Sequence, residues 1–509
     1  MLFNSYIFIF AFLPAALLVF FLLSKYASQR AALCSLIAAS LIFYAWWNPV
    51  YVWLIVGLIA FNYAAGHALI HRRGQFSPRL VLFLGLACNL GILVYFKYGN
   101  FFFHFHKVLL PLGISFFIFQ KIAYLVDAAQ GKIKKQDLLH YSLFVVFFPQ
   151  LIAGPIVHFK EVVPQFNNKN TFRFNPANFA VGFTIFFIGL AKKVFIADQA
   201  AKFANPVFTL VSQGHALTFF EAWGAALAYT FQIYFDFSGY SDMAIGLARL
   251  FGVRLPLNFH SPYKAVNIID FWRRWHMTLS RFLRDYVYIP LGGNRLGARR
   301  RYVNILLTMF LGGLWHGAGW TFILWGLLHG VYLCFNHAWH ALREKTGMGR
   351  SPTRVGQWAG RVTTFLAVVA AWVLFRSQDL RGCVAMFKGM LGMNGIVLWD
   401  TYQAKLNKFA GLGDALGRMG VQYGAVDFFQ KKEAIVLLVL LAAVWALPNT
   451  QQIMARYRPA LVVYTKEAAQ KLWWQWRPSA AWAWALVCLT VLTVSGYMAQ
   501  VSEFLYFNF

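Results

Sequence analysis

The chain is short of acidic residues and of charge altogether. It has 17 Asp and Glu against 46 Lys and Arg, and only 12% of its 509 residues are charged, about half the share in soluble proteins. A water-soluble globule of this composition is therefore excluded. Intrinsic disorder is excluded as well, because 60% of the residues are apolar and 19% are aromatic. We predict one integral membrane body that takes in residues 1–509.

Cysteine is scarce, and several catalytic motifs are missing. The five cysteines lie in apolar segments without a CxxC pair, so they indicate neither a disulfide framework nor a zinc site. His337 and His340 have the spacing of two metal ligands on a helix, but no third ligand is in register, and we expect no metal. No GxSxG, Walker, GxGxxG or HExxH motif is present, which removes support for a serine hydrolase, a nucleotide hydrolase or a zinc protease.

Apolar runs near the length needed to cross a bilayer, about 20 residues, recur along the whole chain. They predict an all-α polytopic fold with about 11–13 membrane helices. Pro149, Gly154 and Pro155 interrupt the sixth run and the ninth is short, so we expect one or both of them to be re-entrant or half-length helices. The thirteen candidate spans are 3–23, 31–47, 50–70, 80–97, 108–127, 138–154, 178–197, 217–235, 302–316, 320–341, 360–375, 434–448 and 480–500.

The positions of the cations predict the orientation. On a soluble protein the excess of 46 − 17, or +29, would suggest nucleic acid, but in membrane proteins Lys and Arg gather in cytoplasmic loops. We therefore expect no nucleic-acid partner. Cations follow the first, third and fifth spans, whereas the intervening loop at Asn48 has none, which places the N-terminus outside. Cations in 456–477 place the C-terminus outside too. The loop cations are Lys25, Arg30, Arg72, Arg73, Arg79, Lys132, Lys134 and Lys135; those in 456–477 are Arg456, Arg458, Lys466, Lys471 and Arg477.

Two polar segments stand apart from the spans. Residues 258–301 hold nine cations against Asp270 and Asp285, which predicts a cytoplasmic segment. Its aromatic residues suggest an interfacial amphipathic helix with its apolar side in the bilayer. Residues 376–433 have mixed charge, and the parity of the spans places them outside, where they would meet a partner or an exported substrate. The C-terminal spans follow in 434–509.

A histidine inside an apolar run is the strongest candidate for chemistry. His316 lies in Leu311-Gly-Gly-Leu-Trp-His-Gly-Ala-Gly-Trp320, where the glycines permit close approach. An ionisable side chain at membrane depth costs free energy and commonly marks a reaction centre or a pathway. The same pattern also fits a histidine that only packs helices together. Spacing alone does not separate the two.

A second histidine, His276, lies in the basic stretch Phe271-Trp-Arg-Arg-Trp-His-Met-Thr-Leu-Ser-Arg-Phe-Leu-Arg-Asp-Tyr286. One interpretation is a helix whose arginines bind the phosphates of membrane lipids, with the histidine incidental. The other is a cationic face that binds an anionic acyl donor and delivers its thioester to the deeper His316. Asp236 and Asp242 flank a span, and we expect them to pair with arginines in a structural role.

These stretches, taken together, resemble the membrane-bound O-acyltransferase (MBOAT) family, and within it the bacterial branch that O-acetylates alginate. The resemblance covers most of the first 340 residues, and the block around His276 together with the WHG at His316 is specific. Residues 376–433 match nothing in that pattern. The matching text is Phe43-Tyr-Ala-Trp-Trp47, Gly113-Ile-Ser-Phe-Phe117, Phe148-Pro-Gln-Leu-Ile-Ala-Gly-Pro155, Phe235-Asp-Phe-Ser-Gly-Tyr-Ser-Asp242, Asn258-Phe, Ser261-Pro-Tyr263, Arg273 to Arg295, Gly313-Leu-Trp-His-Gly317 and Ser502-Glu-Phe-Leu-Tyr-Phe507.

The resemblance implies an enzyme of the bacterial inner membrane with periplasmic termini. It would pass acetyl from a cytoplasmic thioester, acetyl-CoA, to an exported polysaccharide, with periplasmic O-acetyltransferase partners. Alginate is the acceptor that the matching blocks favour, and peptidoglycan or cellulose are the alternatives. The family's essential histidine corresponds to His316 and its second polar position to His276.

The chemistry of the residues is compatible with this. An acyl thioester is already activated, so the site needs no bound cofactor; it must align donor and acceptor and remove a proton. We expect His316 to be the general base, in a water-poor tunnel reached from both sides, with transient acylation of its ring as the alternative. His276 would orient the thioester or stabilise its oxyanion. The expected donor and substrate contacts are Arg273, Arg274, Trp315, Asn294 and Arg295.

Two other functions use the same features. A lipid or polymer transporter would use the buried histidine for proton coupling and the basic segment for anionic headgroups. A transporter, however, would be expected to place its cations near the bilayer midplane. A lipid or sterol acyltransferase of the same family would differ only in its acceptor.

Overall fold

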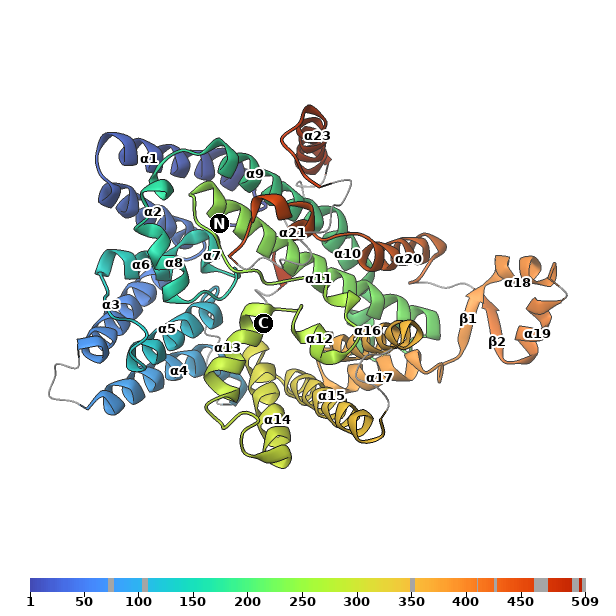
Figure 1. The fold of residues 1–509 in the computed structure, drawn as a ribbon. Helices are drawn as coiled ribbons and strands as arrows, with labels where there is room; N and C mark the ends of the chain where they lie inside the picture. The colour runs from blue at the N-terminus through green and yellow to red at the C-terminus, as the bar shows by residue number, and fades with distance from the viewer. Residues whose placement is uncertain are drawn as a thin grey trace.

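The computed structural model describes residues 1–71, 77–102, 109–347, 353–409, 411–424, 428–461, 475–496 and 503–505, and these are mostly helical (Figure 1). A helix lies at each of the thirteen ranges predicted as membrane spans. Arg72, Arg73, Lys466 and Lys471, which support part of the predicted orientation, lie outside the described residues, as does most of the tail after 496.

Five helices in the described residues are both long and apolar enough to cross a membrane, and two apolar helices are shorter. The long ones are Phe8–Tyr26, Val50–His71, Pro78–Gly99, Pro176–Ser212 and Arg354–Arg376, and the short ones are Gln29–Ala45 and Ala480–Ser495. Many of their side chains face outward, as expected of helices in lipid. The first elements are η1 (Phe8–Phe12), α1 (Leu13–Tyr26), α2 (Gln29–Ala45), α3 (Val50–His71) and α4 (Pro78–Phe102).

The sixth candidate span turns back on itself. Its helix breaks at Phe147, and Asp127 at the end of the preceding helix meets residues from both sides of the segment: Lys132 at 3.1 Å and His158 at 3.8 Å. The segment therefore begins and ends on the same side, as its prolines predicted. The elements are α5 (Ile114–Ala129), α6 (Leu138–Val146), α7 (Phe148–Leu151), α8 (Phe159–Phe166) and η2 (Lys169–Phe172).

A buried helix, α11 (Phe219–Leu250), forms the centre of the molecule (Figure 1). It packs against α9 (Pro176–Ala191) so closely that a Cβ on Gly189 would lie 2.5 Å from the Gly239 carbonyl oxygen. Small residues at such crossings are typical of packed membrane helices. Helix α9 itself runs on without a break through η3 (Lys192–Ala197) into α10 (Asp198–Ser212).

The basic segment 258–301 differs from its prediction. It is several short pieces instead of one amphipathic helix, and its apolar side chains are buried against the protein's own helices: Trp275, for example, lies 4.8 Å from Trp372, centroid to centroid. One continuous helix cannot pass through His276, whose φ of 40° lies in the left-handed region. The pieces are η4 (Pro262–Lys264), α12 (Ile268–Trp272), α13 (Met277–Leu283) and η5 (Arg284–Tyr288), followed by α14 (Gly297–His316), α15 (Trp320–Lys345) and α16 (Arg354–Arg376).

In the segment after α16, Leu380–Met390 pack against α11, whereas residues 396–424, which hold a two-stranded parallel sheet, project from one end of the molecule (Figure 1). Glu503–Leu505 of the tail return to the central helix, where the Leu505 amide donates to Asp236 and Phe504 stacks on Tyr240. The remaining elements are α17 (Leu380–Met390), β1 (Ile396–Trp399), α18 (Asp400–Asn407), α19 (Leu412–Arg418), β2 (Val421–Gly424), α20 (Lys431–Ala446), α21 (Thr450–Ile453), η6 (Ala455–Tyr457) and α23 (Ala480–Gly496).

Candidate active site

The two histidines singled out in the sequence meet inside the protein. His316 is the last residue of α14, and His276 immediately precedes α13. Their ring centroids are 6.4 Å apart, and the residues are 2% and 0% exposed. A non-glycine residue at φ 40° is strained, and such strain concentrates at functional sites.

Asn258 fixes the protonation of His276. The Asn258 side-chain oxygen accepts from the Thr278 amide and hydroxyl, and it lies 3.0 Å from Nδ1 of His276. Because that oxygen is an acceptor, Nδ1 must carry the proton and the neutral ring has its lone pair on Nε2. Burial lowers the pKa of His276 to about 3, which keeps the ring neutral. In this tautomer Nε2 can accept a hydrogen bond from an N–H or O–H group of the substrate. It cannot donate a hydrogen bond to an oxyanion.

Aromatic rings enclose His316. Trp315, Trp325 and Phe375 lie with their ring centroids 4.8, 5.0 and 5.1 Å from it. Trp325 reaches this position because α14 and α15 cross at Gly313 and Gly326, where a side chain on either glycine would collide with the other helix. The surroundings of His316 are therefore aromatic and shielded from solvent.

A buried lysine holds the end of α14. Lys97, from α4, donates to the Trp315 carbonyl, to the His316 carbonyl at 3.0 Å and to Ser115 Oγ at 3.3 Å. These three partners match the three N–H groups of an ammonium. A cation at the C-terminal end of a helix is also stabilised by the helix dipole. Lys97 was not among the residues predicted from the sequence, although a lysine in an apolar span is a signal for such a residue.

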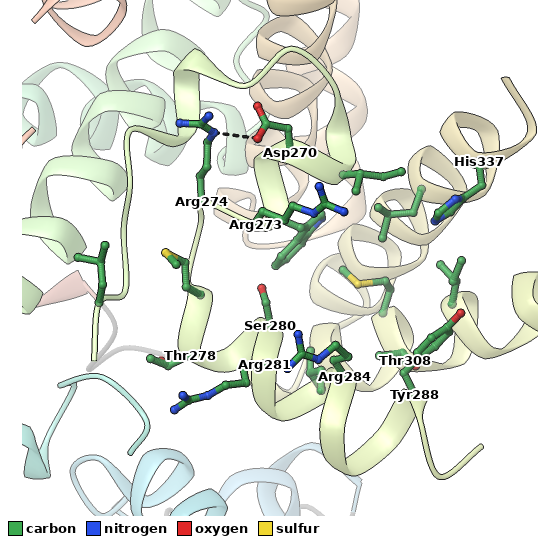
Figure 2. A pocket seen from close by; sticks show the side chains of 18 of the residues that line it. Asp270, Arg273, Arg274, Thr278, Ser280, Arg281, Arg284, Tyr288, Thr308 and His337 are labelled. Atoms are coloured by element: carbon green, nitrogen blue, oxygen red, sulfur yellow. Dashed lines mark hydrogen bonds and ion pairs between the residues drawn. The ribbon is translucent and has the colours of Figure 1, made fainter. Parts of the chain in front are cut away.

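A pocket of about 840 Å³ that is lined by several arginines lies close to His276, and Figure 2 shows its lining side chains. Met277 and Thr278, the two residues after His276, form part of its wall. The pocket is lined by Pro256, Leu257, Ile269, Asp270, Trp272, Arg273, Arg274, Met277, Thr278, Ser280, Arg281, Leu283, Arg284, Tyr288, Ile305, Thr308, Met309, Leu333 and His337.

Carboxylates hold three of the pocket's arginines in place. Arg274 Nε lies 2.9 Å from Asp270, as the dashed line in Figure 2 shows. Arg281 donates to both carboxylate oxygens of Glu161, at 2.6 and 2.9 Å, and Arg284 forms an ion pair with Asp285 at 2.7 Å. Arg274, Arg281 and Arg284 all line the same pocket, so several guanidinium groups border it. Guanidinium forks of this kind suit phosphate groups.

The structure brings together most of the predicted site residues. Arg273 and Arg274 line the pocket, and Trp315 lies between the histidines and α5, with its ring 5.7 Å from that of His276. Asn294 and Arg295 instead lie on an exposed turn outside the pocket lining. That turn is directed away by positive φ at Gly292 and Gly293, and it is held by Asn304, whose amide donates to two of its carbonyls.

The pairing of the two central carboxylates was predicted wrongly in one respect. Asp236 and Asp242 are buried and paired as expected, but with Lys193 and Lys192, each at 2.6 Å, and not with arginines. Both lysines lie on η3, which crosses α11 at this point. Among the described residues, no three His, Cys, Asp or Glu side chains are placed to hold a metal.

Comparison with known proteins decides the family. The family model described as "MBOAT, membrane-bound O-acyltransferase family" matches residues 92–375, which include both histidines, Lys97 and the pocket. The chain belongs to the membrane-bound O-acyltransferase family. It is therefore a polytopic membrane protein and an O-acyltransferase, so a transporter without acyl chemistry is set aside.

Named relatives are similar over much of the MBOAT chain. It is 46% identical to the peptidoglycan O-acetyltransferase of Helicobacter pylori, over 78% of this chain and 81% of the relative. It is 37% identical to the probable alginate O-acetylase AlgI of Pseudomonas aeruginosa, over the full length of both. A teichoic acid D-alanyltransferase of Streptococcus thermophilus is 29% identical over 52% of this chain and 68% of its own. The first two support an O-acetyltransferase for a polysaccharide.

Proposed function

We propose that this protein transfers acetyl from a cytoplasmic thioester, acetyl-CoA, toward a hydroxyl of an exported polysaccharide. The observation that carries the proposal is the placement of His316 and His276 side by side, directly behind an arginine-lined pocket. The pocket supplies phosphate-binding groups, and the histidine pair supplies a base in a dry environment. Both are what acyl transfer from a thioester requires.

In the proposed reaction His316 is the general base. The acceptor oxygen attacks the thioester carbonyl carbon, and the His316 imidazole takes the hydroxyl proton. The tetrahedral intermediate then expels the thiolate, breaking the C–S bond, and the imidazolium returns the proton to sulfur. The products are free CoA thiol and an O-acetyl ester of the acceptor at this site, from which the periplasmic partners would pass the acetyl group to the polymer. His276, held by Asn258, orients the reacting groups through Nε2.

The donor would enter through the arginine pocket. Arg273 and Arg274 are the proposed contacts for its phosphates, and Arg281 and Arg284 extend the same surface (Figure 2). His316 is not among the lining residues; Trp272 lines the pocket, and Trp325 lies between it and His316. The thioester therefore reaches the base only when these rings shift to admit it.

We place the protein in the inner membrane with the pocket toward the cytoplasm. His158 ties the basic loop at Lys132 to the basic segment 258–301, because it contacts both Asp127 and Tyr286. Phe3 and Phe504 both stack on Tyr240, at 4.8 and 4.6 Å, which supports two termini on one side, the periplasm. Basic loops on the other side are typical of the cytoplasmic face.

Alginate is the first proposed acceptor, since relatives named for alginate O-acetylation match from end to end. Peptidoglycan is the second, because the Helicobacter pylori relative has the higher identity. In either system, periplasmic O-acetyltransferases would complete the transfer, and the segment 376–433, of which residues 396–424 project from the molecule, is the proposed meeting place for partner or polymer.

The acceptor is tested by complementation. The chain is expressed in one host that lacks its alginate O-acetylase and in another that lacks its peptidoglycan O-acetyltransferase, and ester-linked acetate is measured on each purified polymer. Acetate restored on alginate alone supports the first acceptor, and acetate restored on peptidoglycan alone supports the second. Acetate on lipid with none on either polymer would contradict both and favour the lipid acyltransferase.

A further inference from the structure

One face of α15 carries two buried N–H donors that lack an acceptor. Trp325 is 1% exposed and His329 is 0% exposed, and neither Trp325 Nε1 nor His329 Nε2 has a hydrogen-bond partner among the described residues. The two residues are four apart on a helix, so they lie on the same face. Their ring centroids are 4.9 Å apart.

A hydrogen bond settles which nitrogen of His329 carries the proton. The indole N–H of Trp272 donates to His329 Nδ1 at 3.3 Å. An indole nitrogen only donates, so Nδ1 must be the acceptor and the proton of the neutral ring is on Nε2. His329 therefore presents a true N–H donor, fixed in its tautomer by a residue that lines the arginine pocket.

The same face of α15 joins the pocket to His316. Leu333 and His337, the next residues at four-residue spacing, line the pocket, and Trp325 lies against His316 at the other end. From position 325 to position 337 the helix rises about 18 Å at 1.5 Å per residue. An extended arm whose phosphates sit among the arginines would follow this face to reach the base.

We propose that Trp325 and His329 donate hydrogen bonds to carbonyl oxygens of the acyl donor. Trp325, next to His316, binds the thioester carbonyl and holds the negative charge that develops there, and His329 binds an amide carbonyl of the pantetheine arm. A buried N–H without an acceptor is costly, and a substrate carbonyl removes that cost. The inference rests on the proposed thioester donor. It also supplies the oxyanion donor that the tautomer of His276 does not provide.

Binding of two CoA compounds to the full-length protein, in detergent and without acceptor, tests the thioester contact. S-ethyl-CoA lacks the thioester oxygen of acetyl-CoA but keeps every other group. We expect the wild type to bind acetyl-CoA about 10-fold more tightly, the worth of one good hydrogen bond, and Trp325→Phe to bind both about equally. Equal affinities in the wild type would overturn the role of Trp325 without the need for any variant.

Turnover tests both donors. Trp325→Phe is expected to lower kcat about 100-fold, as loss of one oxyanion donor does. His329→Phe is expected to raise KM for acetyl-CoA, and His329→Gln, which keeps an N–H donor, to restore it. Trp320→Phe and His340→Phe, on exposed positions of α15, are matched controls. Wild-type kinetics in both site variants would contradict the inference, whereas absence of acetyl transfer by the wild type would contradict the proposed function instead.

Discussion

Asn258 and His276 form the contact that orients one of the two candidate catalytic histidines: the amide oxygen of Asn258 lies 3.0 Å from Nδ1 of His276. The same oxygen accepts twice from Thr278, so the loop at 258 and the start of α13 are locked together around one buried imidazole. His276 keeps its strained backbone because these contacts hold it there.

Removing that contact is expected to impair catalysis and also to lower the stability of the fold, because the buried Thr278 donors lose the same acceptor. In Asn258→Ala the buried Nδ1–H loses its acceptor and the ring is free to turn, so kcat should fall about 10- to 100-fold. Acetyl transfer from labelled acetyl-CoA measures the effect, and Asn170→Ala, on an exposed position, is the control. An unchanged kcat in Asn258→Ala would show that the orientation of His276 does not matter.

Lys97 is expected to support both stability and activity. Lys97→Met removes the ammonium from the carbonyls of Trp315 and His316, and hydrogen bonds to a charged group contribute about 1.5–3 kcal/mol. We predict a lower thermal midpoint in detergent and reduced acetyl transfer. Lys25→Met, an exposed lysine at the end of α1, should change neither. If Lys97→Met behaves like this control, Lys97 does not position His316.

The arginine pocket is expected to govern donor affinity. The double variant Arg273→Ala with Arg274→Ala should raise KM for acetyl-CoA about 10-fold or more, because phosphate contacts are lost, with a smaller change in kcat. The effect should weaken at high salt, which screens exposed charges. Arg295→Ala, on the turn outside the pocket, should change KM less, and the exposed Arg173→Ala not at all. If the double variant leaves KM for acetyl-CoA unchanged, the donor does not bind through these two arginines.

The helices could be predicted from the sequence because bilayer crossing imposes long apolar runs, and each predicted range contains a helix. His316 could be found because polar groups in such runs are few, and His276 because the basic block around it resembles the family. The residues that contact these histidines could not be predicted from the sequence. Lys97, Asn258 and His329 reach the site from distant elements, and only tertiary packing decides that they meet.

The basic segment 258–301 shows a second limit of prediction from the sequence. Alternating aromatic and cationic residues fit a helix at the membrane surface, but in the structure the aromatic side chains fill the interior around Trp275 and the arginines line a pocket. Composition gives the same signal for both arrangements, because each has an apolar and a cationic side. The left-handed backbone at His276 excludes a single surface helix, and a histidine in the sequence does not predict that conformation.

The most direct test of the account is acetyl transfer by His316→Ala. Membranes containing the variant, and the partners that the wild type needs, receive labelled acetyl-CoA, and label in polymer is counted; His340→Ala, exposed on α15, is the control. General-base catalysis contributes about 10²- to 10⁴-fold, so we predict that transfer falls by at least that lower factor while the amount of protein in the membrane stays the same. Normal acetylation by His316→Ala would contradict the account.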